Sequence, residues 1–92
     1  MLLRAITNGA ITGTGEITVK SFKIGAVLIT TDNSNAATVI LRREDASGKP
    51  IFDIQTVTTI WVAGPISTED TTTNHYTISG TSAEAQLYEW ID

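Results

Sequence analysis

From Ile17 onward, short runs of β-branched and aromatic residues alternate with short clusters of turn-forming residues. Within the runs, apolar and polar side chains alternate with a period of two, as expected for strands that bury one face. Runs and turns at this spacing are typical of an antiparallel sandwich or barrel. The pattern predicts seven strands, over residues 17–20, 22–31, 37–43, 51–55, 58–62, 74–78 and 85–90.

The first 16 residues lack the period of either a helix or a strand. They contain three of the seven glycines of the chain, Gly9, Gly13 and Gly15, among Ala, Ile and Thr. Such a segment is predicted to be an extended arm or an irregular first strand, and to become ordered against a partner. The chain therefore divides into an N-terminal arm, residues 1–16, and a sandwich domain, residues 17–92.

Three polar clusters predict tight turns, because Asn, Asp, Ser and Gly either mimic turn backbone or tolerate a left-handed φ. Residues 32–35, 46–50 and 79–82 are each expected to close a hairpin of two antiparallel strands. The turn at 79–82 leads into the C-terminal strand. The alternative there is a short helix from Ser82, which resembles a cap followed by good helix formers.

Proline and a polar run predict where the strand at 58–62 ends. Pro65 is expected to break the run that holds Trp61 and Val62, because proline lacks a backbone donor. The stretch of Ser, Thr and acidic residues that follows, at 67–74, is expected to be an exposed loop.

Side-chain alternation indicates which face of each strand is buried. In 37–43, Ala37, Val39 and Leu41 share one face, which is the core candidate. In 22–31, one face is expected to hold Phe22, Ile24, Ala26 and Leu28, and the other Lys23, Gly25, Val27 and Ile29. The second of these faces becomes apolar towards its end, so this strand is expected to be covered on both sides, as at a subunit contact. In 85–90, alternation leaves open which face is buried.

Composition supports an all-β chain. Thr, Ile and Val make up 33 of the 92 residues, and there is no cysteine to form a disulfide. A chain of this length buries only roughly 60–65% of its unfolded surface, which leaves little room for a deep cleft. The predicted fold is a single antiparallel β-sandwich, jelly-roll or immunoglobulin-like, of seven to eight strands with an extended N-terminal arm.

Charge is unevenly distributed. The net charge is -4, and residues 64–92 hold five acidic and no basic side chains. Without clustered Lys and Arg, direct nucleic-acid binding is disfavoured, and the acidic third is either a solvated face or a docking charge. No stretch approaches the roughly 20 apolar residues of a membrane span, and Met1–Arg4 lacks the apolar run of a signal peptide. We expect a chain made in, and used from, a cytoplasm.

The residues that can carry catalysis or hold metal do not form a known pattern. The single histidine, His75, lies among Thr and Asn, and is expected to be a rim residue rather than part of a triad. The carboxylate pairs 44–45 and 69–70 lie beside turns and are expected to be solvated. The oxygen-rich residues at 32–35 match no calcium loop, and the glycines of the arm match no phosphate-binding loop. We expect no enzymatic activity, no cofactor and no metal.

The order of turns and strands carries a resemblance. Its segments are FKIGAV (22–27), NAATVILR (35–42), IFDI (51–54), WVAGPI (61–66), YTISGT (76–81) and AQLY (85–88). Over residues 17–90, this order resembles the small β-sandwich structural proteins of tailed bacteriophages, in particular head decoration or cement proteins. The resemblance implies a non-enzymatic virion protein, made in the host cytoplasm, which binds the major capsid protein or another virion protein on the outside of the shell, where capsomers meet. It also implies a homo-oligomer, with a trimer favoured, whose N-terminal arm contacts the shell.

Large apolar side chains in the arm, in the strand 22–31 and among the aromatic residues are the candidates for a partner interface. They are Leu2, Leu3, Ile6, Ile11, Val27, Ile29, Trp61, Tyr88 and Trp90. Two alternatives remain open for the function. One is a carbohydrate-binding or adhesion module, in which Trp61, Tyr88 and Trp90 stack on sugar rings. The other is a tail or fibre subunit of a phage.

Overall fold

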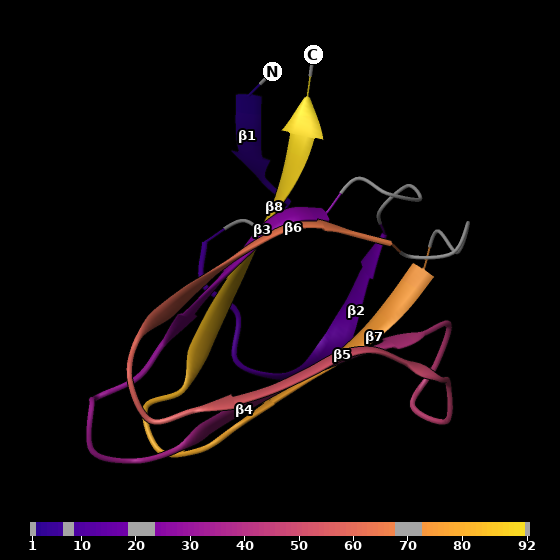
Figure 1. The fold of residues 1–92 in the computed structure, drawn as a ribbon. Helices are drawn as coiled ribbons and strands as arrows, with labels where there is room; N and C mark the ends of the chain where they lie inside the picture. The colour runs from indigo at the N-terminus through magenta and orange to yellow at the C-terminus, as the bar shows by residue number, and fades with distance from the viewer. Residues whose placement is uncertain (1, 7–8, 19–23, 68–72, 92) are drawn as a thin grey trace.

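The strands of the chain form two antiparallel sheets that face each other (Figure 1). The computed structural model describes residues 2–6, 9–18, 24–67 and 73–91. The strands are β1 (Leu2–Ala5), β2 (Gly13–Thr18), β3 (Ile24–Thr30), β4 (Ala37–Arg43), β5 (Pro50–Thr56), β6 (Ile60–Ile66), β7 (Thr73–Ser79) and β8 (Glu84–Ile91). Sheet A has the order β1-β8-β3-β6, and sheet B has the order β2-β7-β4-β5.

The strand order is that of a jelly roll, in which a long two-stranded ribbon is rolled into a sandwich. Along the ribbon β1 pairs with β8, β2 with β7, β3 with β6, and β4 with β5. Further pairing of β3 with β8 and of β4 with β7 completes the two sheets. The predicted antiparallel β-sandwich is confirmed, and its order is the jelly-roll one rather than the immunoglobulin-like one.

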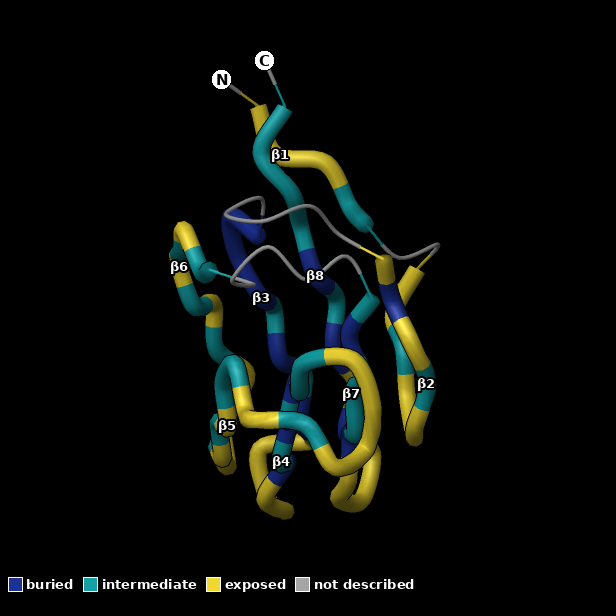
Figure 2. The backbone as a smooth tube through the Cα atoms, turned by 90° about the vertical axis from the view of Figure 1, so that its right-hand side faces the viewer, coloured by how far each residue is buried: buried dark blue, intermediate teal, exposed yellow. Residues whose placement is uncertain are grey.

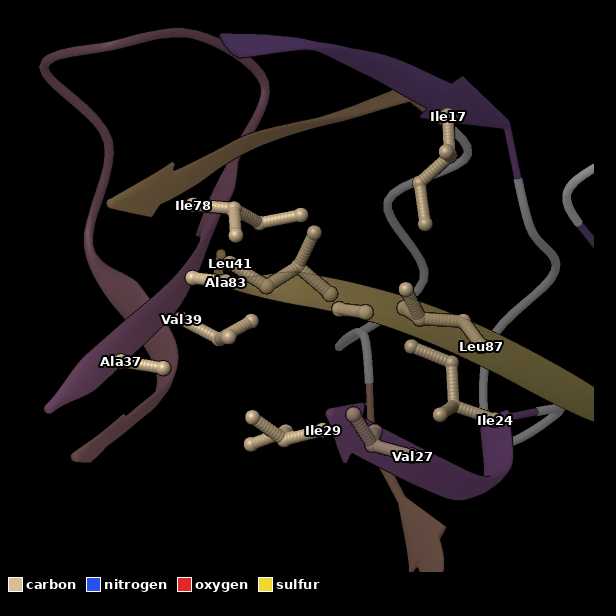
Figure 3. Close-up of a cluster of buried hydrophobic side chains, with 11 residues drawn as sticks. Ile17, Ile24, Val27, Ile29, Ala37, Val39, Leu41, Ile78, Ala83 and Leu87 are labelled. Carbon is tan, nitrogen blue, oxygen red and sulfur yellow. The ribbon is translucent and has the colours of Figure 1, made fainter. Parts of the chain in front are cut away.

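The core lies between the sheets and consists of aliphatic side chains from both (Figure 3). Ala37, Val39 and Leu41 point inward from β4 and are at most 1% exposed, which confirms the face predicted for this strand. Val27 and Ile29 point inward from β3, on the opposite side of the core. Each fully buried Val, Leu or Ile contributes roughly 1.5–3 kcal/mol relative to an exposed one, so this thin layer is the main source of stability.

A β-bulge changes the face assignment predicted for β3. The register shifts between Ile24 and Ala26 against both neighbouring strands. Against β8 the extra residue is Gly25, whereas against β6 the extra residue lies on β6, where Gly64 and Pro65 are opposite Gly25. Ile24 therefore joins Val27 in the core instead of sharing a face with Ala26. The predicted alternation through Gly25 is wrong, because the simple period of two holds only where the ladder is uninterrupted. Phe22 and Lys23 lie outside the described residues.

The C-terminal segment is a strand, so the helix alternative is wrong. Ala85 and Leu87 are buried in the core, and alternation therefore places Gln86 and Tyr88 on the outer face of sheet A. Cross-strand pairing with both β1 and β3 satisfies the backbone of this segment, which outweighs its modest helix propensity.

Only one of the three predicted hairpins is a hairpin. The turn after Arg43 joins the paired strands β4 and β5, as predicted, and the Arg43 N–H donates to the Lys49 carbonyl (3.0 Å). The turns at 32–35 and 79–82 instead carry the chain from one sheet to the other, because β3 and β8 belong to sheet A, and β4 and β7 to sheet B. Turn-forming residues specify a reversal of the chain and not the sheet in which it continues.

Asp32 organises the turn between β3 and β4. Its side chain accepts hydrogen bonds from the side-chain amide of Asn35 and from the backbone N–H groups of Asn35 and Ser34, all at 2.8 Å. These bonds hold the pKa of the Asp32 carboxyl below its usual value, the Asn35 side chain contributing most. Because the pKa is lowered in the folded state, the ionised Asp32 stabilises the turn at pH values above the ordinary aspartate pKa. This stabilisation is lost as the pH falls through the folded-state pKa.

Pro65 does not end β6, which continues to Ile66. The prediction of a break is wrong because β6 lies at the edge of sheet A, and Pro65 falls in the irregularity between Ala63 and Ile66, where it has no register partner in β3. The loop predicted at 67–74 ends earlier than expected, because β7 already begins at Thr73. Residues 68–72 lie outside the described residues.

The segment predicted to be an arm contributes to both sheets. Leu2–Ala5 forms β1, and β2 begins at Gly13. Between them, the Ile6 N–H donates to the Leu87 carbonyl (2.8 Å), and Ile11 forms a bridge with Ala85. The described part of this segment therefore follows the edge of β8 before it crosses to sheet B.

Replacing Gly80 with Ala tests the turn between β7 and β8. Gly80 has a φ of 120°, and a Cβ there would collide with the carbonyl oxygen of Ala36. We expect Gly80→Ala to lower the free energy of unfolding by roughly 2–4 kcal/mol, from backbone strain plus overpacking, as measured by urea denaturation. Gly9→Ala is the matched control, because Gly9 also has a positive φ but no atom within 4 Å of the new Cβ. Equal losses for the two variants would show that the Ala36 contact imposes no constraint.

Candidate functional site

The outer face of sheet A carries a group of apolar and aromatic side chains. In the antiparallel register, Leu28 is opposite Trp61 on one side and Gln86 on the other. Directly opposite residues point to the same side of a sheet, and the alternate residues of these strands fill the core. The outer positions therefore lie on one side of the sheet, and six of them are here called the aromatic face: Ala26, Leu28, Trp61, Ala63, Gln86 and Tyr88. Ala26 is completely buried, and the pair of Thr30 and Glu84 continues the same side at the start of β8.

Trp61 and Tyr88 form the centre of the aromatic face. Their ring centroids are 5.2 Å apart with an interplanar angle of 47°, within the range of favourable aromatic pairs. The Tyr88 hydroxyl donates to Gln86 Oε1 (3.2 Å), which orients the ring. Trp61 is nevertheless 51% exposed. A large, oriented and half-exposed aromatic residue is typical of a surface that binds a partner.

A second exposed feature lies at the end of sheet A, where β1 and the last residues of β8 project beyond the sandwich (Figures 1 and 2). We call this pair of segments, Leu2–Ala5 with residues 88–91, the terminal ribbon. A Cβ on Gly25 would lie 2.5 Å from Leu3 Cδ2 and 2.8 Å from Trp90 Nε1, so both side chains pack directly on the backbone of the bulge. Arg4 and Glu89 form a salt bridge (2.6 Å) across the terminal ribbon.

The nine predicted interface residues fall into three groups. Leu2 and Leu3 are exposed in the terminal ribbon, Trp61 is exposed on the aromatic face, and Tyr88 and Trp90 are half-buried. Ile6 and Ile11 are partly buried and pack against the core of their own sandwich. Val27 and Ile29 are completely buried. The last two therefore offer no surface to a partner, and the predicted subunit contact on their face of β3 is corrected to a core contact.

The outer face of sheet B is polar, in contrast to the aromatic face. His75 in β7 lies between Glu16 of β2 and Arg42 of β4 in the register. The next outward row contains Thr77, which lies between Thr14 and Ile40. The two sheets thus present chemically different surfaces, and Trp61 and His75 lie on opposite sides of the sandwich.

The described acidic residues considered as catalytic carboxylates or metal ligands have local roles. Asp45 lies in the turn between β4 and β5, where its side chain accepts from the Ser47 N–H (2.9 Å). Glu69 and Asp70 lie outside the described residues. Within the described ranges, no three His, Asp or Glu side chains lie close enough together to hold a metal ion. A search of the same residues finds no helix with the length and apolarity needed to cross a membrane.

Asn74 is a buried polar residue that the sequence pattern did not single out. It is completely buried, and neither atom of its side-chain amide has a hydrogen-bond partner among the residues that the structure describes. Leaving such a group unpaired costs about 1–3 kcal/mol. An Asn beside a run of Thr resembles loop sequence, so no signal in the chain indicated a core position.

Truncating one core residue and one residue of the aromatic face separates their roles. We expect Ile29→Ala to lower the free energy of unfolding by about 2–5 kcal/mol, because it leaves a cavity in the core. Trp61→Ala is expected to cost about 1 kcal/mol, since half of its side chain is exposed in the folded chain. Urea denaturation followed by circular dichroism gives both values. Similar losses would mean that Trp61 serves the fold rather than a partner.

Comparison with known proteins returns no relative. No protein-family model matches the chain, no curated protein matches it, and no solved structure matches it. The strand order, the two unlike sheet faces and the distribution of charge are the features of the chain that bear on its function.

Proposed function

We propose that the chain is a non-enzymatic structural protein of a virus particle. It binds the major capsid protein, or another virion protein, on the outer surface of the assembled shell and stabilises the seam between capsomers. In this role it acts as a homo-oligomer, is made in the host cytoplasm and resides in the virion.

The observation that carries this proposal is the aromatic face on a jelly roll. Jelly rolls occur in viral capsid proteins and lectins, but a fold shared by several functions does not choose among them. The aromatic face supports protein contact, because its six residues include two aromatic rings and no charge, and the charged Glu84 lies at its margin. The centres of protein interfaces are likewise depleted in charge and enriched in Trp and Tyr.

Binding across a seam stabilises a shell by mass action. A protein that binds the assembled lattice, but not its separated subunits, lowers the free energy of the assembled state. Several weak contacts from one oligomer act together, because after the first has formed the others are intramolecular. Pairing of every described strand within the sheets gives the domain the hydrogen-bonded framework that such a contact needs.

Titration of purified shells tests the proposal. Shells of the source virus, stripped of this chain, are mixed with increasing amounts of it and sedimented. We expect saturable binding at a fixed ratio to the major capsid protein, and at least a tenfold loss of affinity for Trp61→Ala, as at an interface hot spot. Thr14→Ala, on the outer face of sheet B, is the matched control and should bind normally. The proposal fails if binding does not saturate, or if the chain is missing from purified virions.

A carbohydrate-binding or adhesion module is the second candidate, and the exposed Trp61 ring beside Tyr88 favours it. Such rings stack on the apolar faces of sugars. This reading predicts that a glycan shifts the tryptophan emission of the wild-type chain, and that the shift disappears in Trp61→Phe, which leaves Trp90 as the only emitter. A glycan array without any hit above background would remove this candidate. Gold labelling of virions distinguishes the head from the tail or fibre.

A further inference from the structure

We infer that the free edge of β6 pairs with β6 of a second copy of this chain, in antiparallel fashion about a two-fold axis. The inference deepens the proposed function, on which its biological setting rests, by naming the contact between copies. It replaces the trimer implied by the resemblance with a two-fold pair. The observation that carries it is that β6 is an edge strand without charged residues and that its Trp61 side chain is exposed.

β6 is an edge without the charges that usually protect an edge. Among the described residues it pairs on one side only, with β3. The other three edge strands each carry a charged residue, Arg4 in β1, Glu16 in β2 and Asp53 in β5, whereas β6 (IWVAGPI) carries none. Charged side chains on an edge prevent strand addition. Pro65 is the only residue of β6 that lacks a backbone N–H, and it follows Ile60–Ala63. These four residues can therefore pair through their backbones.

The start of β6 is held in place by a network of threonine hydroxyls. Thr59, directly before β6, accepts from the Thr31 N–H through Oγ1 (3.1 Å). The Thr31 hydroxyl in turn donates to the Val57 carbonyl (2.6 Å). These bonds tie the approach to β6 to the end of β3. The edge is therefore ordered before a partner arrives, which lowers the entropy cost of pairing.

The charge of the chain favours a contact at this edge over contacts elsewhere between copies. Two copies each carry a net charge of -4, so most approaches bring like charges together. Like charges placed opposite each other across a pair of strands are destabilising. Pairing of β6 with its copy places no charged side chain opposite another, since neither strand has one. Two copies can therefore meet at this edge without charge repulsion between the paired strands, although each chain is acidic.

The side chains of β6 fit a register centred on Val62. Pairing about that residue places Trp61 of each copy opposite Ala63 of the other, both on the outer side of sheet A. A large ring beside a small side chain avoids the clash that two opposed Trp rings would make. The two aromatic faces then become continuous across the axis, in a single sheet with the order β1-β8-β3-β6 followed by its mirror sequence in the second copy.

The contact is small, so the pair is expected to be weak in solution. A contact of about five residues on each side, Ile60–Gly64, lies below the roughly 1,000 Å² typical of stable complexes. We therefore expect reversible dimers, with dissociation in the micromolar to millimolar range. On a shell, neighbouring copies are held at high local concentration, where a weak contact becomes effective.

Sedimentation equilibrium of the purified chain tests the pair. Between about 10 μM and about 1 mM we expect the mean mass to rise from one chain towards two. Ala63→Lys places a positive charge beside the axis on each copy and is expected to weaken association at least tenfold. Thr14→Lys, which puts the same charge on the outer side of edge strand β2, is the matched control and should associate like the wild type. Circular dichroism verifies that each variant is folded.

Amide hydrogen exchange provides a second readout at residue level. Dimerisation through this edge should slow exchange of amides within Ile60–Gly64 as concentration rises, with no such change in β2. A chain that remains monomeric to about 1 mM overturns the inference, as does a closed trimer or an equal effect of the two Lys variants. Shell binding is measured separately, so a monomer that still saturates shells would refute the pair while leaving the proposed function intact.

Discussion

Burial of aliphatic side chains between the two sheets is the constraint on which the rest of the structure depends. With Val27 and Ile29 on one side and Val39 and Leu41 on the other, each strand must turn one face inward. The alternate residues are then forced outward, because neighbouring side chains of a strand point to opposite faces. The position of Trp61 on the surface thus follows from the packing of its neighbours in β6, the partly buried Ile60 and Val62, against the core.

The same constraint gives the sandwich two unlike surfaces. On sheet A the outward positions hold the tilted pair of Trp61 and Tyr88, while on sheet B they hold His75 between Glu16 and Arg42. Burying a charged group without a partner costs free energy because the group loses its hydration, so the polar face is suited to remain exposed. The aromatic face gains free energy when it is covered. A domain built in this way has a preferred side for contact before any partner is considered.

Sequence reasoning predicted the strands and the all-β fold because both depend on local pattern, as β4 shows. It failed where long-range pairing decides the outcome. The turn at Asp32 leads to the other sheet, the bulge at Gly25 reverses the alternation, and Pro65 is tolerated because its strand is at an edge. In the candidate site, the exposed Trp61 was predicted, whereas the buried Ile29 was assigned to a contact. An apolar residue has the same pattern in a core and in an interface, so only the packing separates them.

The terminal ribbon brings the two ends of the chain together, since Leu2 is the register partner of Ile91. Any polypeptide joined before β1 or after β8 therefore emerges at the same point, beyond the end of the sandwich (Figure 1). A short linker across this gap would make a circular chain, and the turn between β4 and β5 is a natural place to open it again. The fold can accordingly serve as a display scaffold that holds two fused peptides side by side.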